Sequence, residues 1–117
     1  MVRRRFRGRS KPVGKYKSSL EKRFADVLAE CLSEGKIIWW KYEPMRFRLT
    51  DRDLLTTYTP DFAAMFPDGT ITIYETKGRW TSSGRIKTKL MADQYFMFKV
   101  VGVQWKQKQW KYEDFSK

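Results

Sequence analysis

Three charged residues mark one short stretch of the sequence, YTPDFAAMFPDGTITIYETKG, which spans residues 58–78. Asp61 opens one strand-like run, and Glu75 and Lys77 close the next. If the runs pair across the Pro-Asp-Gly turn at residues 67–69, Asp61 lies opposite Glu75 or its neighbour, with facing Cβ atoms about 5 Å apart. Glu75 and Lys77 then point to one face, because side chains two apart on a strand share a face. The pattern predicts that the three groups converge at one edge of a sheet.

Two carboxylates at this separation repel each other unless a cation lies between them or one stays protonated. Oxygen ligands without histidine or cysteine favour Mg²⁺ or Mn²⁺, which keep waters and accept phosphate oxygens as further ligands. Such an ion polarises a phosphodiester and lowers the pKa of a bound water, so no histidine base is needed. Lys77 could orient that water or stabilise charge on the phosphate. The three residues therefore predict Mg²⁺-dependent or Mn²⁺-dependent phosphodiester hydrolysis.

The same residues also allow purely structural roles. Asp61 could begin a strand after Pro60 or cap a turn, and Glu75 with Lys77 could form an exposed salt bridge of little energetic consequence. The sequence alone leaves these alternatives open.

Composition restricts the other chemistry available to the chain. The 117 residues, 41% hydrophobic and 16% aromatic, are typical of one folded domain. The absence of histidine and the single cysteine, Cys31, exclude serine and cysteine triads, Cys/His zinc sites and internal disulfides. We find neither a signal peptide nor a run long enough to span a membrane. We therefore expect a cytoplasmic protein.

Positive charge is concentrated at the N-terminus. The formal net charge is +12, and residues 1–17 contain no acid. We expect residues 1–17 to form a flexible basic arm that contacts nucleic acid, ahead of the domain over residues 18–117 that carries the three charged residues. A solvated tail, or an arm that contacts a ribosome or an acidic membrane face, is the alternative. The basic residues of the arm are Arg3, Arg4, Arg5, Arg7, Arg9, Lys11, Lys15 and Lys17.

The first helix is expected over residues 18–33, with Gly35 as its stop signal. Its apolar stripe places Glu21 at the edge of the core, so the Glu21 side chain can point along that edge. Ser18 and Glu21 also form a capping-box pattern, in which Glu21 would bond back to the helix start. The stripe consists of Leu20, Phe24, Val27, Leu28, Cys31 and Leu32.

Period-two patterns and turn residues indicate the strands. Residues 51–57 predict a loop, or a strand that pairs outside its own domain, and residues 104–115 have no firm assignment. Strands are expected at residues 37–42, 45–49, 62–66, 70–77 and 100–105. A second helix is expected over residues 85–98, with Ile86, Leu90, Met91 and Met97 inward and Gln94 on the same side.

The words YTPDF and ETKGRW resemble the phage endonuclease I family of Holliday-junction resolvases. Pro60-Asp61 and Glu75-Thr76-Lys77 also match the motif of the PD-(D/E)xK, restriction-nuclease-like superfamily. The resemblance covers about residues 18–103. It implies an α/β fold with a restriction-endonuclease-like core, in which helix, three strands, helix and strand follow in order and a mixed sheet is flanked by helices.

The resemblance also implies roles for individual residues. It implies that Glu21, Asp61 and Glu75 bind the metal and that Lys77 completes the catalytic set. It further implies a homodimer, in which about residues 46–57 could be exchanged between subunits. The chain ends sooner after its last strand than the family pattern suggests, so its substrate preference could differ. Phosphate contacts are predicted for Arg79, Arg85 and Gln94, each with a surface role as the alternative.

We therefore expect a Mg²⁺-dependent endonuclease that acts on branched DNA. Alternatives are a restriction-like or nicking nuclease on duplex DNA, and a basic DNA-binding protein without catalysis. An RNA-binding or ribosome-associated protein is a further class, although no aromatic signature of an RNA-recognition sheet is present.

Overall fold

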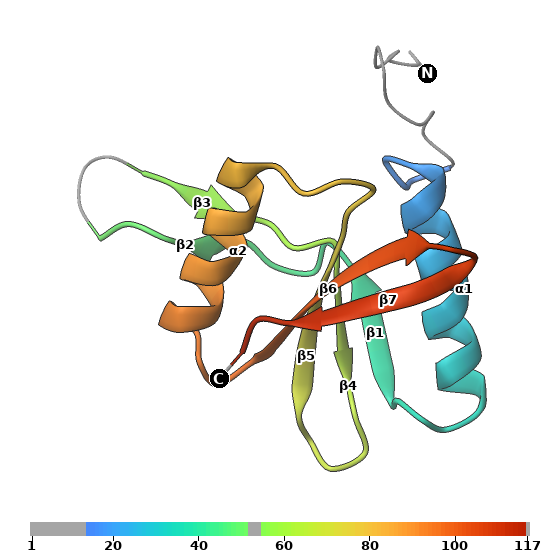
Figure 1. Ribbon diagram of the computed structural model, residues 1–117. Helices are drawn as coiled ribbons and strands as arrows, with labels where there is room; N and C mark the ends of the chain where they lie inside the picture. Colours follow the sequence, from blue (N-terminus) through green and yellow to red (C-terminus); the bar gives the residue numbers. More distant parts are fainter. Residues whose placement is uncertain (1–13, 52–54, 117) are drawn as a thin grey trace.

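The computed structural model describes residues 14–51 and 55–116. In this part of the chain, α1 (Ser19–Ser33) and α2 (Ser82–Gln94) flank a five-stranded sheet with the order β1-β4-β5-β6-β7 (Figure 1). The pair β5–β6 is parallel and the other pairs are antiparallel, so the sheet is mixed. The strands of this sheet are β1 (Trp39–Tyr42), β4 (Phe62–Met65), β5 (Ile71–Thr76), β6 (Lys99–Lys106) and β7 (Gln109–Asp114).

The predicted α/β class is confirmed, as is the order helix, three strands, helix, strand, here α1, β1, β4, β5, α2 and β6. Strand β7 was not predicted. It forms a hairpin with β6, and Trp110 and Tyr112 alternate along it with the charged Lys111 and Glu113. That period-two pattern is the signal that could have identified the strand.

A small second sheet lies beside α2 and consists of β2 (Phe47–Arg48) and β3 (Thr57–Tyr58) (Figure 1). The two strands pair with each other in the same chain. The segment 51–57, for which pairing outside the domain was one alternative, thus contributes Thr57 to an internal pair; residues 52–54 lie outside the described part.

Each face of the large sheet packs against one helix. Phe62 of β4 lies in one core cluster with Phe24 of α1, whereas the next residue, Ala63, lies in another with Met91 of α2. All four side chains are almost completely buried. This alternation follows from the pleat, which directs successive side chains to opposite faces. Within the described part of the chain, no helix is long and apolar enough to cross a membrane.

Helix α2 differs from its prediction in both position and orientation. It begins three residues earlier because Thr81 caps it, accepting a hydrogen bond from the Gly84 backbone N–H at 3.1 Å. Of the four predicted inward side chains only Met91 is buried, and the predicted inward positions of Ile86, Leu90 and Met97 are wrong. The helix instead buries its small residues Thr88 and Ala92 together with Met91. The Thr88 hydroxyl is satisfied by the Gly84 carbonyl, so it can lie inward.

Candidate active site

Asp61 and Glu75 face each other at the edge of the sheet where β4 begins and β5 ends. The β4–β5 register pairs Phe62 with Tyr74, so the next position along places Asp61 opposite Glu75, as expected from the sequence. The Asp61 backbone N–H donates to Glu75 Oε1 at 3.2 Å. The side chains of Asp61 and Glu75 are buried, with residue exposures of 8% and 7%. Two acids are therefore held side by side in a poorly solvated position.

Asp61 is fixed through a single carboxylate oxygen. Its Oδ2 accepts hydrogen bonds from both the backbone N–H and the hydroxyl of Thr76, each at 2.8 Å. Burial, followed by the charges of Glu75 and Glu21, raises the pKa of Asp61 well above its usual range, although the bonds from Thr76 oppose this. Burial likewise raises the pKa of Glu75, against the opposing effect of Lys77. The positive charge of Lys77 and the hydrogen bonds from Thr76 therefore do not offset the cost of ionising both buried acids.

Lys77 supplies the cation next to this pair. Its Nζ lies 3.3 Å from Glu75 Oε2, as expected for residues that share a strand face. The loop that follows is anchored by Trp80, whose ring packs on Phe115 with centroids 5.3 Å apart and covers Gly102 of β6. This packing explains the tryptophan in ETKGRW as a structural anchor for the loop after Lys77.

Replacing Gly102 by alanine should destabilise the protein. A Cβ there would lie 2.6 Å from Trp80 Cζ2 and 2.9 Å from Phe115 Cε2, so both rings would have to move. We expect Gly102→Ala to lower the free energy of unfolding by about 1–3 kcal/mol, the usual cost of overpacking. Urea denaturation measures the change. Gly78→Ala is the matched control, because a Cβ there meets nothing within 4 Å; equal stability of the two variants would contradict this packing.

Glu21 approaches the same edge from the other side of the sheet. Helix α1 covers the face opposite to α2, whereas Glu75 shares the α2 face with Ile73. Glu21 is buried, as expected from the sequence, and its Oε1 accepts hydrogen bonds from the Tyr42 hydroxyl at 2.7 Å and the Lys17 backbone N–H at 3.0 Å. Glu21 thus bonds back to the backbone N–H of Lys17, the residue just before the N-cap Ser18. In this way it performs part of the alternative capping role.

The predicted ligands Glu21, Asp61 and Glu75 do not gather into one cluster of three. Within residues 14–51 and 55–116, no group of three or more acidic, histidine or cysteine side chains is arranged to hold a metal. Asp61 and Glu75 alone nevertheless fit the protein's share of a Mg²⁺ site, because Mg²⁺ keeps several waters and is commonly held by one or two carboxylates plus substrate phosphates. The crowding of two buried acids is an independent reason for a cation there.

The raised pKa values predict that Asp61→Asn stabilises the protein in chelator. Between the ordinary and the raised pKa, the folded state holds a proton that the unfolded state releases, so stability falls as pH rises. Asparagine cannot ionise, and its carbonyl can still accept the bonds from Thr76. At pH 7–8 we expect a gain of about 1 kcal/mol, typical of stabilising substitutions.

Thermal melts between pH 4.5 and pH 8 in chelator measure this effect. The advantage of Asp61→Asn should shrink as pH falls. If Asp61 and Glu75 share a Mg²⁺ ion, added Mg²⁺ should raise the melting temperature of the wild type but not of the variant, because the variant lacks one of the two carboxylates. A variant that melts below the wild type at every pH would contradict the electrostatic account.

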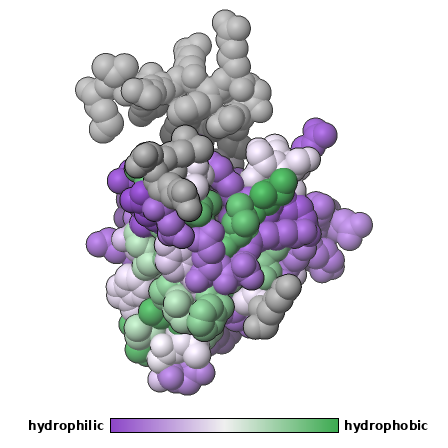
Figure 2. Space-filling view, turned by 90° about the vertical axis from the view of Figure 1, so that its left-hand side faces the viewer, coloured by the Kyte–Doolittle hydropathy of each residue, from purple (hydrophilic) through white to green (hydrophobic). Residues whose placement is uncertain are grey.

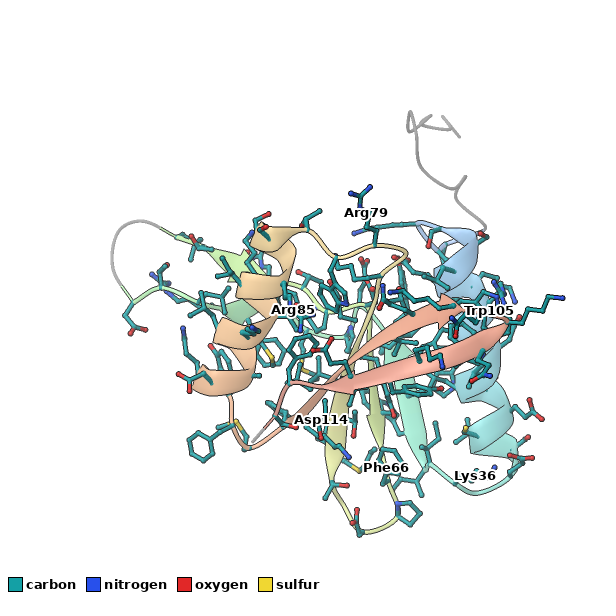
Figure 3. The ribbon with its side chains drawn as sticks, viewed as in Figure 1. Lys36, Phe66, Arg79, Arg85, Trp105 and Asp114 are labelled. Atoms are coloured by element: carbon teal, nitrogen blue, oxygen red, sulfur yellow. The ribbon has the colours of Figure 1, made fainter. Side chains whose placement is uncertain are left out.

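The three predicted phosphate contacts outside the arm lie in different settings. Arg79 is exposed in the loop after Lys77 and points away from the body (Figure 3). Arg85 makes a two-pronged ion pair with Glu113 of β7, with Nη1 and Oε1 2.9 Å apart. Gln94 ends α2 and donates from Nε2 to the Leu49 carbonyl at 3.0 Å. Arg79 is thus the one of the three for which no protein partner is seen in the described structure.

The arm is described only at its end. Tyr16 is buried against Tyr42 and Phe62, and Lys17 pairs with Glu43 Oε2 at 2.7 Å, so packing on the body begins two residues before Ser18. Lys15 is exposed. The remaining predicted contacts lie outside the described residues: Arg3, Arg4, Arg5, Arg7, Arg9 and Lys11.

Two tyrosines belong to this site and were not singled out from the sequence. Tyr42 holds Glu21, and Tyr58, the first residue of YTPDF, lies next to Glu75 and Thr88. The Tyr58 hydroxyl is buried without a hydrogen bond of ordinary geometry, and burial together with Glu75 raises the pKa of its phenol. Because tyrosine is common in strand cores, only its position in the motif word could have indicated Tyr58.

Comparison with known families agrees with the resemblance read from the motif words. The sequence model described as phage endonuclease I matches residues 1–114 of the 117-residue chain. No curated protein and no solved structure matches the chain. Because the match spans nearly the whole sequence, the chain belongs to the phage endonuclease I family and is an endonuclease.

Proposed function

We propose that this endonuclease hydrolyses phosphodiesters in branched DNA with the help of Mg²⁺ or Mn²⁺, that four-way junctions are its preferred substrate, and that it belongs to the PD-(D/E)xK superfamily. The observation that carries the proposal is the buried pair Asp61 and Glu75, with Lys77 3.3 Å from Glu75. A protein that only binds DNA gains nothing from two buried acids close to phosphate.

Each residue of the proposed site has a distinct role. Asp61 and Glu75 would hold the divalent ion, which supplies a polarised phosphate and an acidified water when bound. Thr76 keeps Asp61 Oδ2 in place, so that the carboxylate is oriented before the substrate arrives. Lys77 stabilises negative charge that develops on the phosphate and balances Glu75. Glu21 remains a proposed ligand: Tyr42 fixes its Oε1 by a hydrogen bond, and its charge contributes to the raised pKa of Asp61.

We also propose that the enzyme acts as a homodimer, because a junction presents two strands for symmetric cleavage. Figure 2 shows apolar side chains interrupting the hydrophilic surface on the side that carries α2, β2 and β3. Ile86 and Leu90 of α2 are 56% and 45% exposed, and Phe96 just beyond it is 78% exposed. Exposed apolar groups of this kind support a protein contact there. Light scattering of the purified chain tests the dimer.

Cleavage of labelled DNA tests the function. A four-way junction and a linear duplex of the same sequence are incubated with the enzyme, either with Mg²⁺ or with chelator. We expect cleavage of the junction with Mg²⁺ only, and tighter binding of the junction than of the duplex. Equal binding and cutting of both would indicate a duplex nuclease, and cleavage in chelator would contradict the metal-dependent mechanism.

Deleting residues 1–13 should weaken DNA binding without unfolding the domain. This deletion removes six basic residues and keeps Tyr16 and Lys17, which pack on the body. The salt dependence of log Kobs should flatten by about 0.9 for each phosphate contact that is lost. Fluorescence anisotropy across a salt series measures the slope. If the slope is unchanged, the arm does not contact DNA.

A further inference from the structure

The hairpin of β6 and β7 extends beyond the catalytic edge of the sheet. Because β5 and β6 are parallel, their C-terminal ends lie at the same edge, where Thr76 is paired with Val103. Strand β5 ends there, whereas β6 continues to Lys106, three residues or about 10 Å further. The hairpin therefore continues past the register position of Glu75, and its end lies beside α1 (Figure 1).

The two faces of this hairpin differ in chemistry. On the α1 side, the Arg23 guanidinium lies 4.3 Å from the Trp105 ring centroid and 5.5 Å from that of Trp110. The two rings also contact each other, with centroids 5.1 Å apart, and Trp110 packs on Phe24 of α1. Figure 3 shows Trp105 at the end of the hairpin that meets α1. This contact ties the hairpin to the helix that carries Glu21.

The opposite face of the hairpin is basic. Lys106 alternates with Trp105, so it shares the side of Gly102, on which Trp80 packs after leaving Lys77. Lys111 alternates with Trp110 and lies on that side too. Both lysines are exposed, and neither forms an ion pair within the described structure; Lys111 Nζ only reaches Gln109 Oε1 at 3.4 Å. Residues 104–112 contain no acid.

The turn of the hairpin adds a third lysine at a conformational cost. Gln107 and Lys108 have φ values of 54° and 59°, the left-handed region that a two-residue hairpin turn requires and that favours glycine or asparagine. The sequence instead places a long cationic side chain at the exposed tip. Such a choice is unfavourable for the turn alone and would be accounted for if the lysine contacted an anion.

We infer that the β6–β7 hairpin is a DNA-binding element of this enzyme, in which Lys106, Lys108 and Lys111 contact backbone phosphates beside the strand that is cut. The inference rests on the proposed function only for its DNA substrate and does not depend on a metal. Phosphate contacts of this kind position DNA without reading its sequence. The hairpin holds these lysines in place, because Trp105 and Trp110 on its other face pack on α1.

Binding of a labelled four-way junction in chelator, measured by anisotropy over a series of salt concentrations, tests the inference with the full chain. In Lys106→Gln/Lys111→Gln, the slope of log Kobs against log salt should flatten by about 1.8, or about 0.9 per contact. At 0.15 M salt the same relation gives a loss of affinity of up to about thirtyfold. A far-UV spectrum and a melting curve establish that the variant is folded.

The matched control removes the same charge at the opposite end of the sheet. Lys36 precedes β1 and Lys99 begins β6, so Lys36→Gln/Lys99→Gln should leave slope and affinity near the wild type. If the hairpin variant also keeps the wild-type slope, the inference is overturned and the lysines only protect the exposed edge strand. If the slope flattens but the wild type does not cleave with Mg²⁺, the hairpin contact stands and the proposed nuclease mechanism fails.

Lys108→Gly tests the contribution of the Lys108 charge to DNA binding separately from the stability of the turn. Glycine suits the left-handed position, so the melting temperature should stay equal or rise, while affinity for the junction falls up to about fivefold, as for one lost contact. A variant with unchanged affinity would remove the turn lysine from the proposed surface.

Discussion

Asp61→Asn and Glu75→Gln should each reduce cleavage of a four-way junction by about a thousandfold or more. Each change removes one of the two buried carboxylates that would hold the divalent ion, and with it the acidified water and the polarised phosphate. The fold should survive, because both amides keep the size of the acid and retain an oxygen to accept the present hydrogen bonds. Single-turnover cleavage with Mg²⁺ measures the loss.

Binding separates loss of chemistry from loss of fold. Either variant should bind the junction in chelator at least as tightly as the wild type, because a negative charge near phosphate has been removed. Asp68→Asn is a matched control, since Asp68 lies in the exposed β4–β5 turn and, among residues 14–51 and 55–116, its side chain is seen to bond with Thr70 alone. Cleavage within tenfold of the wild type in either active-site variant would refute the assignment of these two acids.

Lys77→Met should reduce the cleavage rate by about a hundredfold to a thousandfold. Methionine keeps much of the length of the side chain but removes the ammonium group, which lies 3.3 Å from Glu75 Oε2. The loss should fall on kcat rather than KM if Lys77 acts on charge that develops during the reaction. Single-turnover and steady-state rates with Mg²⁺ give both parameters.

Two further observations test the role of Lys77. Lys77→Arg restores a positive charge but not the compact ammonium, so it should recover only part of the rate. Calorimetric titration with Mn²⁺ should still detect binding in Lys77→Met, although the pKa of Glu75 loses the lowering effect of Lys77. Normal turnover in Lys77→Met would leave the lysine as a structural partner of Glu75 only.

The β4–β5 hairpin could be predicted from the sequence because the residues that define it are close together in the chain. A Pro-Asp-Gly turn and two alternating runs set the register of β4 and β5, and the register brings Asp61 opposite Glu75. The class and order of elements followed from the same patterns together with the family resemblance. Glu21 was correctly placed at the edge of the core, because helical periodicity alone gives its direction.

Other features depend on tertiary contacts that periodicity does not contain. The sequence does not reveal that Glu21 comes from the opposite side of the sheet, where Tyr42 holds it. The predicted orientation of α2 was wrong because large apolar residues such as Ile86 and Leu90 are exposed, whereas Thr88 and Ala92 are buried. Apart from Met91, the side chains that this helix buries against the sheet are small rather than large and apolar.

The most direct test is the position of a bound ion. Crystals of the wild type soaked in Mn²⁺ and measured near the manganese absorption edge should show an anomalous peak between the carboxylates of Asp61 and Glu75. The same soak of Asp61→Asn should show the peak lost or greatly reduced. Ordered carboxylates in the wild type with no peak between them would contradict the claim that these two acids share a divalent ion.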